Sequence, residues 1–157
     1  MKLHFREMPP ADIQSRLGVT DVAREIRSRA LLRRLGVALP PSPVDLLDGR
    51  LKAWECIHDS QAARAQAVGH CTADLITGEI LHLVVNRGYE GRGIGKKLLS
   101  LTVASLRAAG AKRIWLAATA DPTARAHGFY RAVGWRPTGE RTKSGEEILE
   151  LPRDEDR

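Results

Sequence analysis

A run of glycines joins an apolar segment to an amphipathic one between residues 84 and 99, VVNRGYEGRGIGKKLL. The first turn of a helix carries backbone N–H groups without intrahelical partners, and the helix dipole adds partial positive charge there. Gly91, Gly93 and Gly95 would let this backbone approach an oxygen without interference from a Cβ atom. Positive side chains flank the same turn at Arg92, Lys96 and Lys97. The pattern is typical of a phosphate-binding site, although an ordinary strand-to-helix connection uses similar residues.

Two known phosphate-binding motifs are excluded by their spacing. A Walker A loop would need glycine at position 90 and Ser or Thr after the lysine, where this chain has Glu90 and Lys97. A dinucleotide fingerprint that begins at Gly91 or Gly93 would need another glycine five residues later, where lysine or leucine stands. The glycine run therefore predicts neither a P-loop nor a Rossmann site.

The loop 90–95, EGRGIG, resembles the coenzyme A loop of the GNAT superfamily of N-acetyltransferases, whose motif is Gln/Arg-x-x-Gly-x-Gly/Ala. A second block, 123–135, TARAHGFYRAVGW, is similar to the family segment Asn-x-x-Ala-x-x-Phe-Tyr-x-x-x-Gly-Phe. It follows the first block at the expected distance of one helix and one strand. The resemblance covers residues 79–134, and it implies acetyl-CoA as the co-substrate and no metal ion.

The chain departs from the family pattern at three places. Glu90 replaces the usual Gln or Arg, and its carboxylate would repel phosphate if it faced the site. Arg87 and Gly88 stand where Pro-Glu is common. Thr123 replaces an Asn that often contacts the cofactor, and its hydroxyl can still make one hydrogen bond. We therefore expect the loop to bind pyrophosphate mainly through backbone N–H groups.

The resemblance implies further coenzyme A contacts before and after the loop. The backbone of 83–85 would pair with the peptide-like pantetheine arm as an added strand, with burial in a sheet as a compatible alternative. A backbone N–H of Val84 or Val85 would then stabilise negative charge on the thioester oxygen. Phe129 also fits a core position. The implied cofactor-binding residues are Leu83, Val84, Val85, Gly91, Arg92, Gly93, Ile94, Gly95, Lys96, Thr123, Phe129 and Tyr130.

Tyr130 and Glu79 are the predicted catalytic residues. Tyr130 matches the family position whose hydroxyl lies beside the coenzyme A sulfur, and a pKa of ~10 keeps it protonated as a donor to the leaving thiolate. Glu79 matches the glutamate base of the histone-acetylating branch. Strand alternation puts on one face Glu79, Leu81, Leu83 and Val85. His82 would lie on the other face. The alternatives to Glu79 as the base are His82, His127 and a water relay.

The elements that must position these residues form a mixed α/β pattern. The pattern predicts strands at 3–6, 51–57, 66–75, 79–86, 114–119 and 147–151. It predicts helices at 13–35, interrupted near Gly18 and capped by Thr20 or Asp21, at 93–109 and at 123–133. Gly110 and Gly134 would end the last two helices. The order β-αα-βββ-α-β-α-β(β) gives a mainly antiparallel central sheet flanked by helices, as the GNAT fold would, in one domain of residues 1–157.

Composition argues against several other classes, of which a basic nucleic-acid-binding domain, favoured by charge alone, is the remaining rival. The net charge of +6 invites a nucleic-acid partner, but only seven residues are aromatic and none interleaves with the basic ones as a base-stacking surface would. The arginine cluster at 24–34 reads as a solvated helix face. No apolar run is long enough to cross a membrane, and the first residues lack a signal-peptide core. We therefore expect a cytoplasmic protein.

The two cysteines give no disulfide framework and no metal-ligand spacing. Cys56 and Cys71 lie symmetrically about a turn expected near Ala63 and Arg64, which would make them cross-strand neighbours in a hairpin. In a reducing cytoplasm, buried free thiols are the preferred interpretation.

The function expected from the resemblance is direct transfer of an acetyl group from acetyl-CoA to a primary amine in a ternary complex. The acceptor is expected to be a small-molecule amine, with a protein lysine or N-terminal amine as the alternative. A non-catalytic acyl-CoA-binding module is the rival that keeps the loop without the chemistry. Relatives of this family often pair, so a homodimer is compatible with the sequence.

Overall fold

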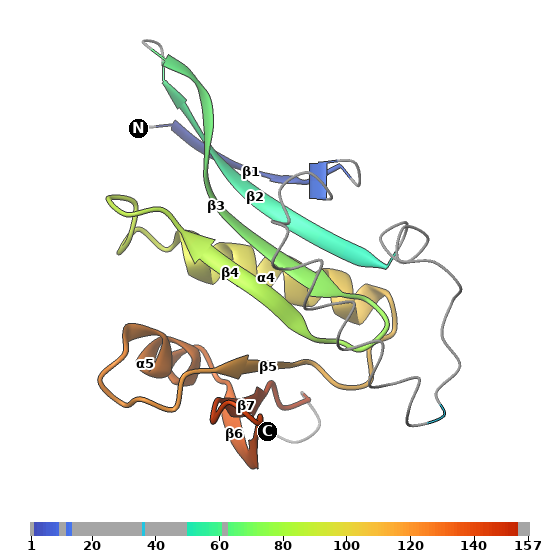
Figure 1. Ribbon diagram of the computed structural model, residues 1–157. Coiled ribbons are helices and arrows are strands. Elements are labelled where there is room, and N and C mark those ends of the chain that lie inside the picture. The colour runs from blue at the N-terminus through green and yellow to red at the C-terminus, as the bar shows by residue number, and fades with distance from the viewer. Residues whose placement is uncertain (1, 10–11, 14–35, 37–49, 61–62, 154–157) are drawn as a thin grey trace.

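The computed structural model describes residues 2–9, 12–13, 36, 50–60 and 63–153 (Figure 1). The expected helices at 13–35 with their caps and the arginine cluster at 24–34 lie outside the described residues, apart from single positions. No helix of the described part is long and apolar enough to span a bilayer.

Seven strands and two helices follow one another in the described chain. The strands are β1 (Lys2–Glu7), β2 (Leu51–Ser60), β3 (Ala63–Asp74), β4 (Ile80–Val85), β5 (Trp115–Ala118), β6 (Arg136–Arg141) and β7 (Glu147–Glu150). The helices are α4 (Ile94–Ala108) and α5 (Arg125–Ala132). The predicted strands and the two predicted C-terminal helices are confirmed within a few residues at each end. The mixed α/β class is also confirmed.

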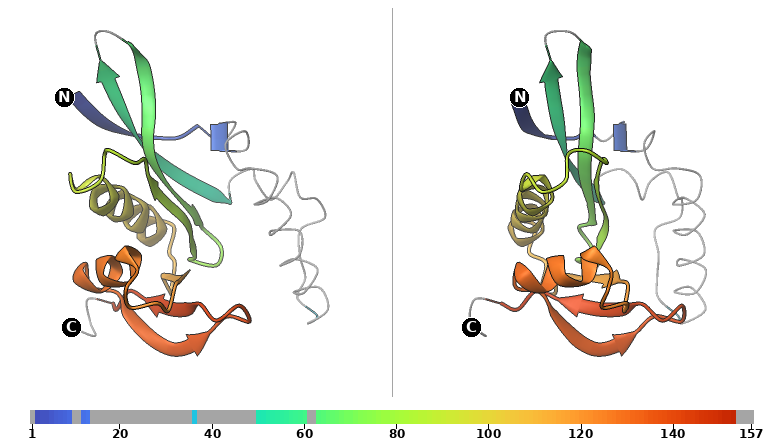
Figure 2. Two further views of the ribbon diagram at one scale, coloured as in Figure 1. Left: turned by 60° about the vertical axis from the view of Figure 1, so that its left-hand side comes forward. Right: turned by 90° about the vertical axis from the view of Figure 1, so that its left-hand side faces the viewer.

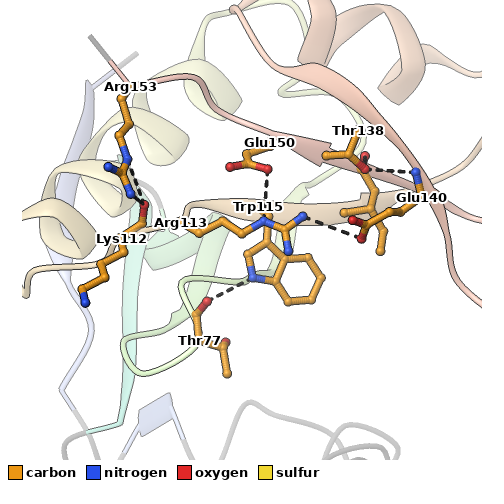
Figure 3. A network of polar contacts seen from close by, with 9 residues as sticks. Thr77, Lys112, Arg113, Trp115, Thr138, Glu140, Glu150 and Arg153 are labelled. Carbon is orange, nitrogen blue, oxygen red and sulfur yellow. Dashed lines mark hydrogen bonds and ion pairs between the residues drawn. The ribbon is translucent and has the colours of Figure 1, made fainter. Parts of the chain in front are cut away.

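The strands form two antiparallel sheets that meet at one point. One sheet has the order β1-β2-β3-β4, and the other has the order β5-β7-β6. A single parallel bridge joins Glu79 to Trp115, where the backbone N–H of Trp115 donates to the carbonyl of Gly78 at 3.2 Å. The Trp115 indole N–H also donates to the carbonyl of Thr77 at 3.0 Å (Figure 3). Beyond this junction, β4 and β5 diverge (Figure 1).

Helix α4 packs on one face of the first sheet because its apolar residues recur on one side of the helix. Its buried residues are Ile94, Leu98, Leu99, Thr102, Val103 and Leu106. They form the main core with β3, β5 and β7 residues such as Cys71, Leu116 and Leu149. A smaller cluster of Met8, Ile13, Leu51 and Ala53 forms separately from this core.

Glycines set the turns that the sequence predicted. Gly78, in the turn between β3 and β4, has φ +77°, and a Cβ atom there would lie 1.8 Å from the Arg113 carbonyl oxygen. Gly110 and Gly134 follow the two helices with φ of +85° and +98°, the left-handed conformation that ends many helices. The predicted stop signals are therefore confirmed.

The register of the β2–β3 hairpin corrects the cysteine prediction. Ser60 pairs with Ala63, so the turn comes two residues earlier than expected, and a bulge follows at Cys56/Ile57. Cys56 consequently faces Gly69, and Cys71 faces Trp54. Both thiols are buried and free. The two cysteines are not directly paired neighbours, because the bulge and the earlier turn shift one strand against the other.

Candidate active site

The glycine loop opens helix α4 with its backbone accessible. Gly93 is the N-cap residue, with φ 78° and ψ 8°, and no side chain makes a capping hydrogen bond to the first turn. Gly91 has φ +74°, and a Cβ atom added at Gly91 or Gly93 would meet no atom within 4 Å. The first turn holds no acidic residue. Uncapped N–H groups beside open space are suited to an oxyanion such as pyrophosphate.

Helix α5 packs against the start of α4. A Cβ atom on Gly95 would lie 3.7 Å from Cζ of Phe129 and 3.6 Å from a methyl group of Val85. The end of β4, the first turn of α4 and the ring of Phe129 therefore meet at Gly95. Phe129 is partly buried against the main core, which agrees with the core position considered for it. Through this contact the two sequence blocks lie side by side.

Tyr130, the next residue of α5, is packed among aromatic rings. Its ring makes edge contacts with Phe129 at 5.2 Å and with Trp135 at 6.1 Å between centroids. Burial, with a smaller contribution from nearby Cys71, raises the pKa of Tyr130 to about 12. The phenol is therefore protonated throughout the physiological range, as a proton donor must be.

The predicted strand at 79–86 is irregular: Glu79 immediately precedes β4, His82 lies within it, and a bulge corrects the predicted alternation. Thr72 pairs with His82 but Ala73 pairs with Ile80, so Leu81 is an extra residue in β4. Leu83 packs on the main core, whereas Leu81 packs on the smaller cluster. Leu81 therefore does not share a face with Leu83 and Val85, because a bulge reverses the side of the sheet to which the preceding side chains point.

The bulge also changes how the two candidate bases relate. Ile80 belongs to the main core, so its extended neighbour Glu79 points to the opposite side of the sheet. His82 pairs with Thr72, which alternates with the main-core residues Cys71 and Ala73, so His82 also points away from that core. The expectation that alternation separates Glu79 from His82 is wrong: the two share a face.

Glu90, the first departure from the family motif, points toward helix α5. Its Oε2 lies 3.1 Å from Nη1 of Arg125, the first residue of α5. Thr123 is likewise engaged: its hydroxyl donates to Oδ1 of Asp121 at 2.7 Å, and its backbone N–H donates to the same oxygen at 2.9 Å. These bonds lower the pKa of Asp121. The Thr123 hydroxyl in this arrangement offers a cofactor only an acceptor.

His127 belongs to a polar contact between α5 and β7. Its Nε2 lies 3.7 Å from Oε2 of Glu147, and the same carboxylate takes two hydrogen bonds from Nη2 of Arg131 at 2.9 and 3.0 Å. The hydrogen bond from Arg131 is the main reason that the pKa of Glu147 is lowered. The contact fastens the helix that carries Tyr130 onto the second sheet.

Sequence reasoning missed three residues that position the loop. Tyr89, which immediately precedes the loop 90–95, shares a hydrogen bond of 2.6 Å with Nδ1 of His58 on β2. Gly69 on β3 faces the first turn of α4, and a Cβ atom there would lie 3.0 Å from the Val84 carbonyl oxygen and 3.1 Å from Leu98. Arg125 is the third. A glycine inside a predicted strand was the one available signal, since it often marks a close approach.

A cavity of about 730 Å³ lies elsewhere, at the C-terminal end of α4, between Arg107, Lys112, Arg136 and Arg153. None of the predicted site residues lines it. Arg153 there donates to the carbonyl of Lys112 (Figure 3). In the described part of the chain, no three His, Cys, Asp or Glu side chains gather as a metal site would require.

Comparisons with known proteins agree with this arrangement. A protein of Prochlorococcus marinus described as an uncharacterized N-acetyltransferase ycf52-like is 32% identical over 117 residues, which are 73% of this chain and 59% of that protein. The chain thus spans about three fifths of that relative's length.

Two solved structures share the fold at low sequence identity. The PaiA N-acetyltransferase of Thermoplasma acidophilum, in complex with coenzyme A, has a TM-score of 0.63 at 16% identity over 98% of this chain and 100% of that one. The ribosomal-protein-S18-alanine N-acetyltransferase of Escherichia coli has a TM-score of 0.54 at 17% identity over 96% of this chain and 94% of that one.

The model of the acetyltransferase (GNAT) family matches residues 40–135, which include the glycine loop, both strands at the junction and helix α5. The chain belongs to the GNAT family of acetyltransferases.

Proposed function

We propose that this protein transfers the acetyl group of acetyl-CoA to a primary amine, by direct attack of the amine on the thioester in a ternary complex. The observation that carries the proposal is the meeting of the open glycine turn, the end of β4 and helix α5 at Gly95 and Phe129. A phosphate-binding turn thereby lies next to the predicted proton donor.

The backbone of the loop supports binding of the pyrophosphate. The backbone N–H groups of 91–96 lie at the first turn of α4, which no side chain caps. The side chains of Arg92 and Lys96 are exposed beside this turn. Strand β4 bonds to β3 along one edge and meets β5 only at Glu79. The other edge at 83–85 can therefore pair with the amides of the pantetheine arm, as an added strand would.

Three groups then serve the transfer. A backbone N–H at Val84 or Val85 stabilises the negative charge that develops on the carbonyl oxygen. Glu79 takes the amine proton, directly or through water, while the new C–N bond forms. Tyr130 donates its proton to the sulfur as the C–S bond breaks, which leaves an amide and free coenzyme A. The proton balance is closed by return of the Glu79 proton to Tyr130 through solvent.

Direct transfer is favoured over a covalent acetyl-enzyme because neither cysteine is suited to attack. Burial raises the pKa of Cys71 to about 12 and that of Cys56 above its ordinary value, so both thiols stay protonated. Both are also buried.

The acceptor proposed first is a small-molecule amine, with a protein amine second. The test is release of free coenzyme A, followed with a thiol reagent, from acetyl-CoA and a panel of amines that includes polyamines, aminoglycosides and peptides with free lysine or N-terminal amines. Turnover with any amine supports the proposal, and the preferred amine identifies the class. Tight binding of acetyl-CoA without turnover on every amine would instead identify a non-catalytic module.

A further inference from the structure

An ion pair bridges the two sides of the proposed coenzyme A site. Glu90 stands immediately before Gly91, and its carboxylate lies 3.1 Å from the Arg125 guanidinium at the start of α5. The loop before α4 and the helix α5 lie at the same side of the molecule in each view (Figures 1 and 2). Arg125 is therefore bound to Glu90, the residue that immediately precedes the glycine turn, although the two residues are 35 positions apart in the sequence.

This ion pair is held weakly. The side chain of Arg125 is 67% exposed and that of Glu90 is 49% exposed, so water and salt screen their attraction. Exposed pairs of this kind contribute ~1 kcal/mol or less to stability. Nη1 of Arg125 donates the hydrogen bond to the Glu90 carboxylate. A guanidinium has five N–H donors in a planar fork, a geometry that matches phosphate. The bond is weak enough for a doubly charged phosphate group to replace it.

We propose that Arg125 binds a phosphate group of coenzyme A and that Glu90 occupies this arginine in the free protein, so that the incoming phosphate displaces the carboxylate. The inference rests on the proposed function. It explains why an acid is tolerated at position 90, where Gln or Arg is usual: the carboxylate is neutralised by Arg125 and turned toward α5 in the free protein.

The two side chains then have opposite effects on affinity. Arg125 supplies a charge-assisted hydrogen bond to the phosphate, so its loss weakens binding of coenzyme A about tenfold. Glu90 competes with the phosphate for the same guanidinium. Its neutralisation therefore tightens binding, by about threefold for an exposed charge.

The experiment compares ligands with and without phosphate. Calorimetry gives the Kd of coenzyme A for the parent, Arg125→Gln, Glu90→Gln and the double variant, and competition with coenzyme A gives the Kd of pantetheine, which lacks the phosphates. Arg125→Gln is expected to raise the Kd of coenzyme A about tenfold and to leave the Kd of pantetheine within twofold of the parent value. Glu90→Gln should tighten coenzyme A, and the double variant should bind as Arg125→Gln does, because Glu90 acts through the arginine. Arg125→Lys, which keeps the charge, should recover part of the loss.

Arg107→Gln is the matched control, since it removes an exposed arginine from the far end of α4. It should leave the Kd of coenzyme A unchanged. If Arg125→Gln weakens the binding of coenzyme A and of pantetheine equally, or changes the binding of neither ligand, the assignment of Arg125 to the phosphate is wrong. If Glu90→Gln weakens coenzyme A, the competing role of Glu90 is wrong. If the parent itself does not bind coenzyme A, the proposed function fails together with this inference.

Discussion

The Tyr89 hydroxyl and Nδ1 of His58 lie 2.6 Å apart, and their rings meet edge to face with centroids 5.5 Å apart. Tyr89 immediately precedes the glycine loop 90–95, whereas His58 belongs to β2 in the hairpin with β3. The hydrogen bond thus joins the loop to a strand that is not its sequence neighbour, and it restricts the loop before any ligand binds. Pre-ordering of this kind reduces the entropy that binding must cost.

Removal of this hydrogen bond should weaken donor binding more than it slows chemistry. In Tyr89→Phe the ring contact remains and only the hydroxyl is lost, so KM for acetyl-CoA should rise about threefold to tenfold while kcat stays near that of the parent. Steady-state kinetics over a range of acetyl-CoA concentrations measures both constants. A fall in kcat with an unchanged KM would show that the bond does not order the donor site.

Gly93→Val should abolish coenzyme A binding in a protein that still folds. Valine is strained at φ +78°, and the strain falls on the N-cap of α4, where the anion site is proposed. Gly110→Val is the matched control, since it places the same residue at φ +85° at the other end of the same helix. Both should lose comparable thermal stability. An unchanged coenzyme A affinity of Gly93→Val in calorimetry would exclude the loop as the site.

Tyr130→Phe should bind coenzyme A as the parent does and turn over about 10²-fold more slowly, because it removes a proton donor and little else. Since burial raises the pKa of Tyr130 to about 12, the parent rate should show no alkaline loss from this phenol below about pH 11. Single-turnover rates between pH 6 and 10 measure both effects. Equal rates in the two proteins would assign the thiol proton to water.

Glu79→Gln should slow acetyl transfer most at neutral pH and recover partly at high pH, where the free amine is abundant without a base. The variant removes a proton acceptor and keeps the size of the side chain. His82→Gln is the decisive companion, because the bulge at Leu81 places both residues on one face of β4. It should keep the parent pH–rate profile. Loss of the acidic limb in His82→Gln with a normal Glu79→Gln would make His82 the base.

Glu147→Gln should destabilise the protein at neutral pH, and the difference should disappear in acid. The bond from Arg131 lowers the pKa of Glu147 below its ordinary 4.5 in the folded state. A carboxylate of this kind contributes stability above pH 4.5, and that contribution is lost as the pH falls through the lowered value. Thermal melts of parent and variant between pH 2 and 7 follow the difference.

The control for this prediction is Glu140→Gln, whose carboxylate makes only a 3.8 Å contact with exposed Arg113 (Figure 3). Its melting temperature should stay close to that of the parent at each pH. A stability difference for Glu147→Gln that is constant across the whole pH range would mean that the ionised form is not what stabilises the contact between α5 and β7.

The sequence alone determined the features that depend on near neighbours along the chain. The glycines at 78, 93 and 110 predict turns and helix ends because few other residues adopt a positive φ, and all three have it. The periodic apolar residues of 93–109 predict α4 because they place one apolar stripe on a helix. The two motif blocks predict the family because their residue types and spacing are read directly.

Only the tertiary structure decided which side chains share a face of a sheet and which distant residues pair with one another. The bulge at Leu81 places Glu79 and His82 on one face, because one extra residue reverses the facing of the residues that precede it. The early turn and the bulge at Cys56/Ile57 together shift the β2–β3 register by two residues, so Cys56 lies opposite Gly69 and not opposite Cys71. The partners of Tyr89 and Glu90 lie 31 and 35 residues away in the sequence. Such pairs depend on how α5 and the hairpin pack around α4, and no local pattern in the chain encodes that packing.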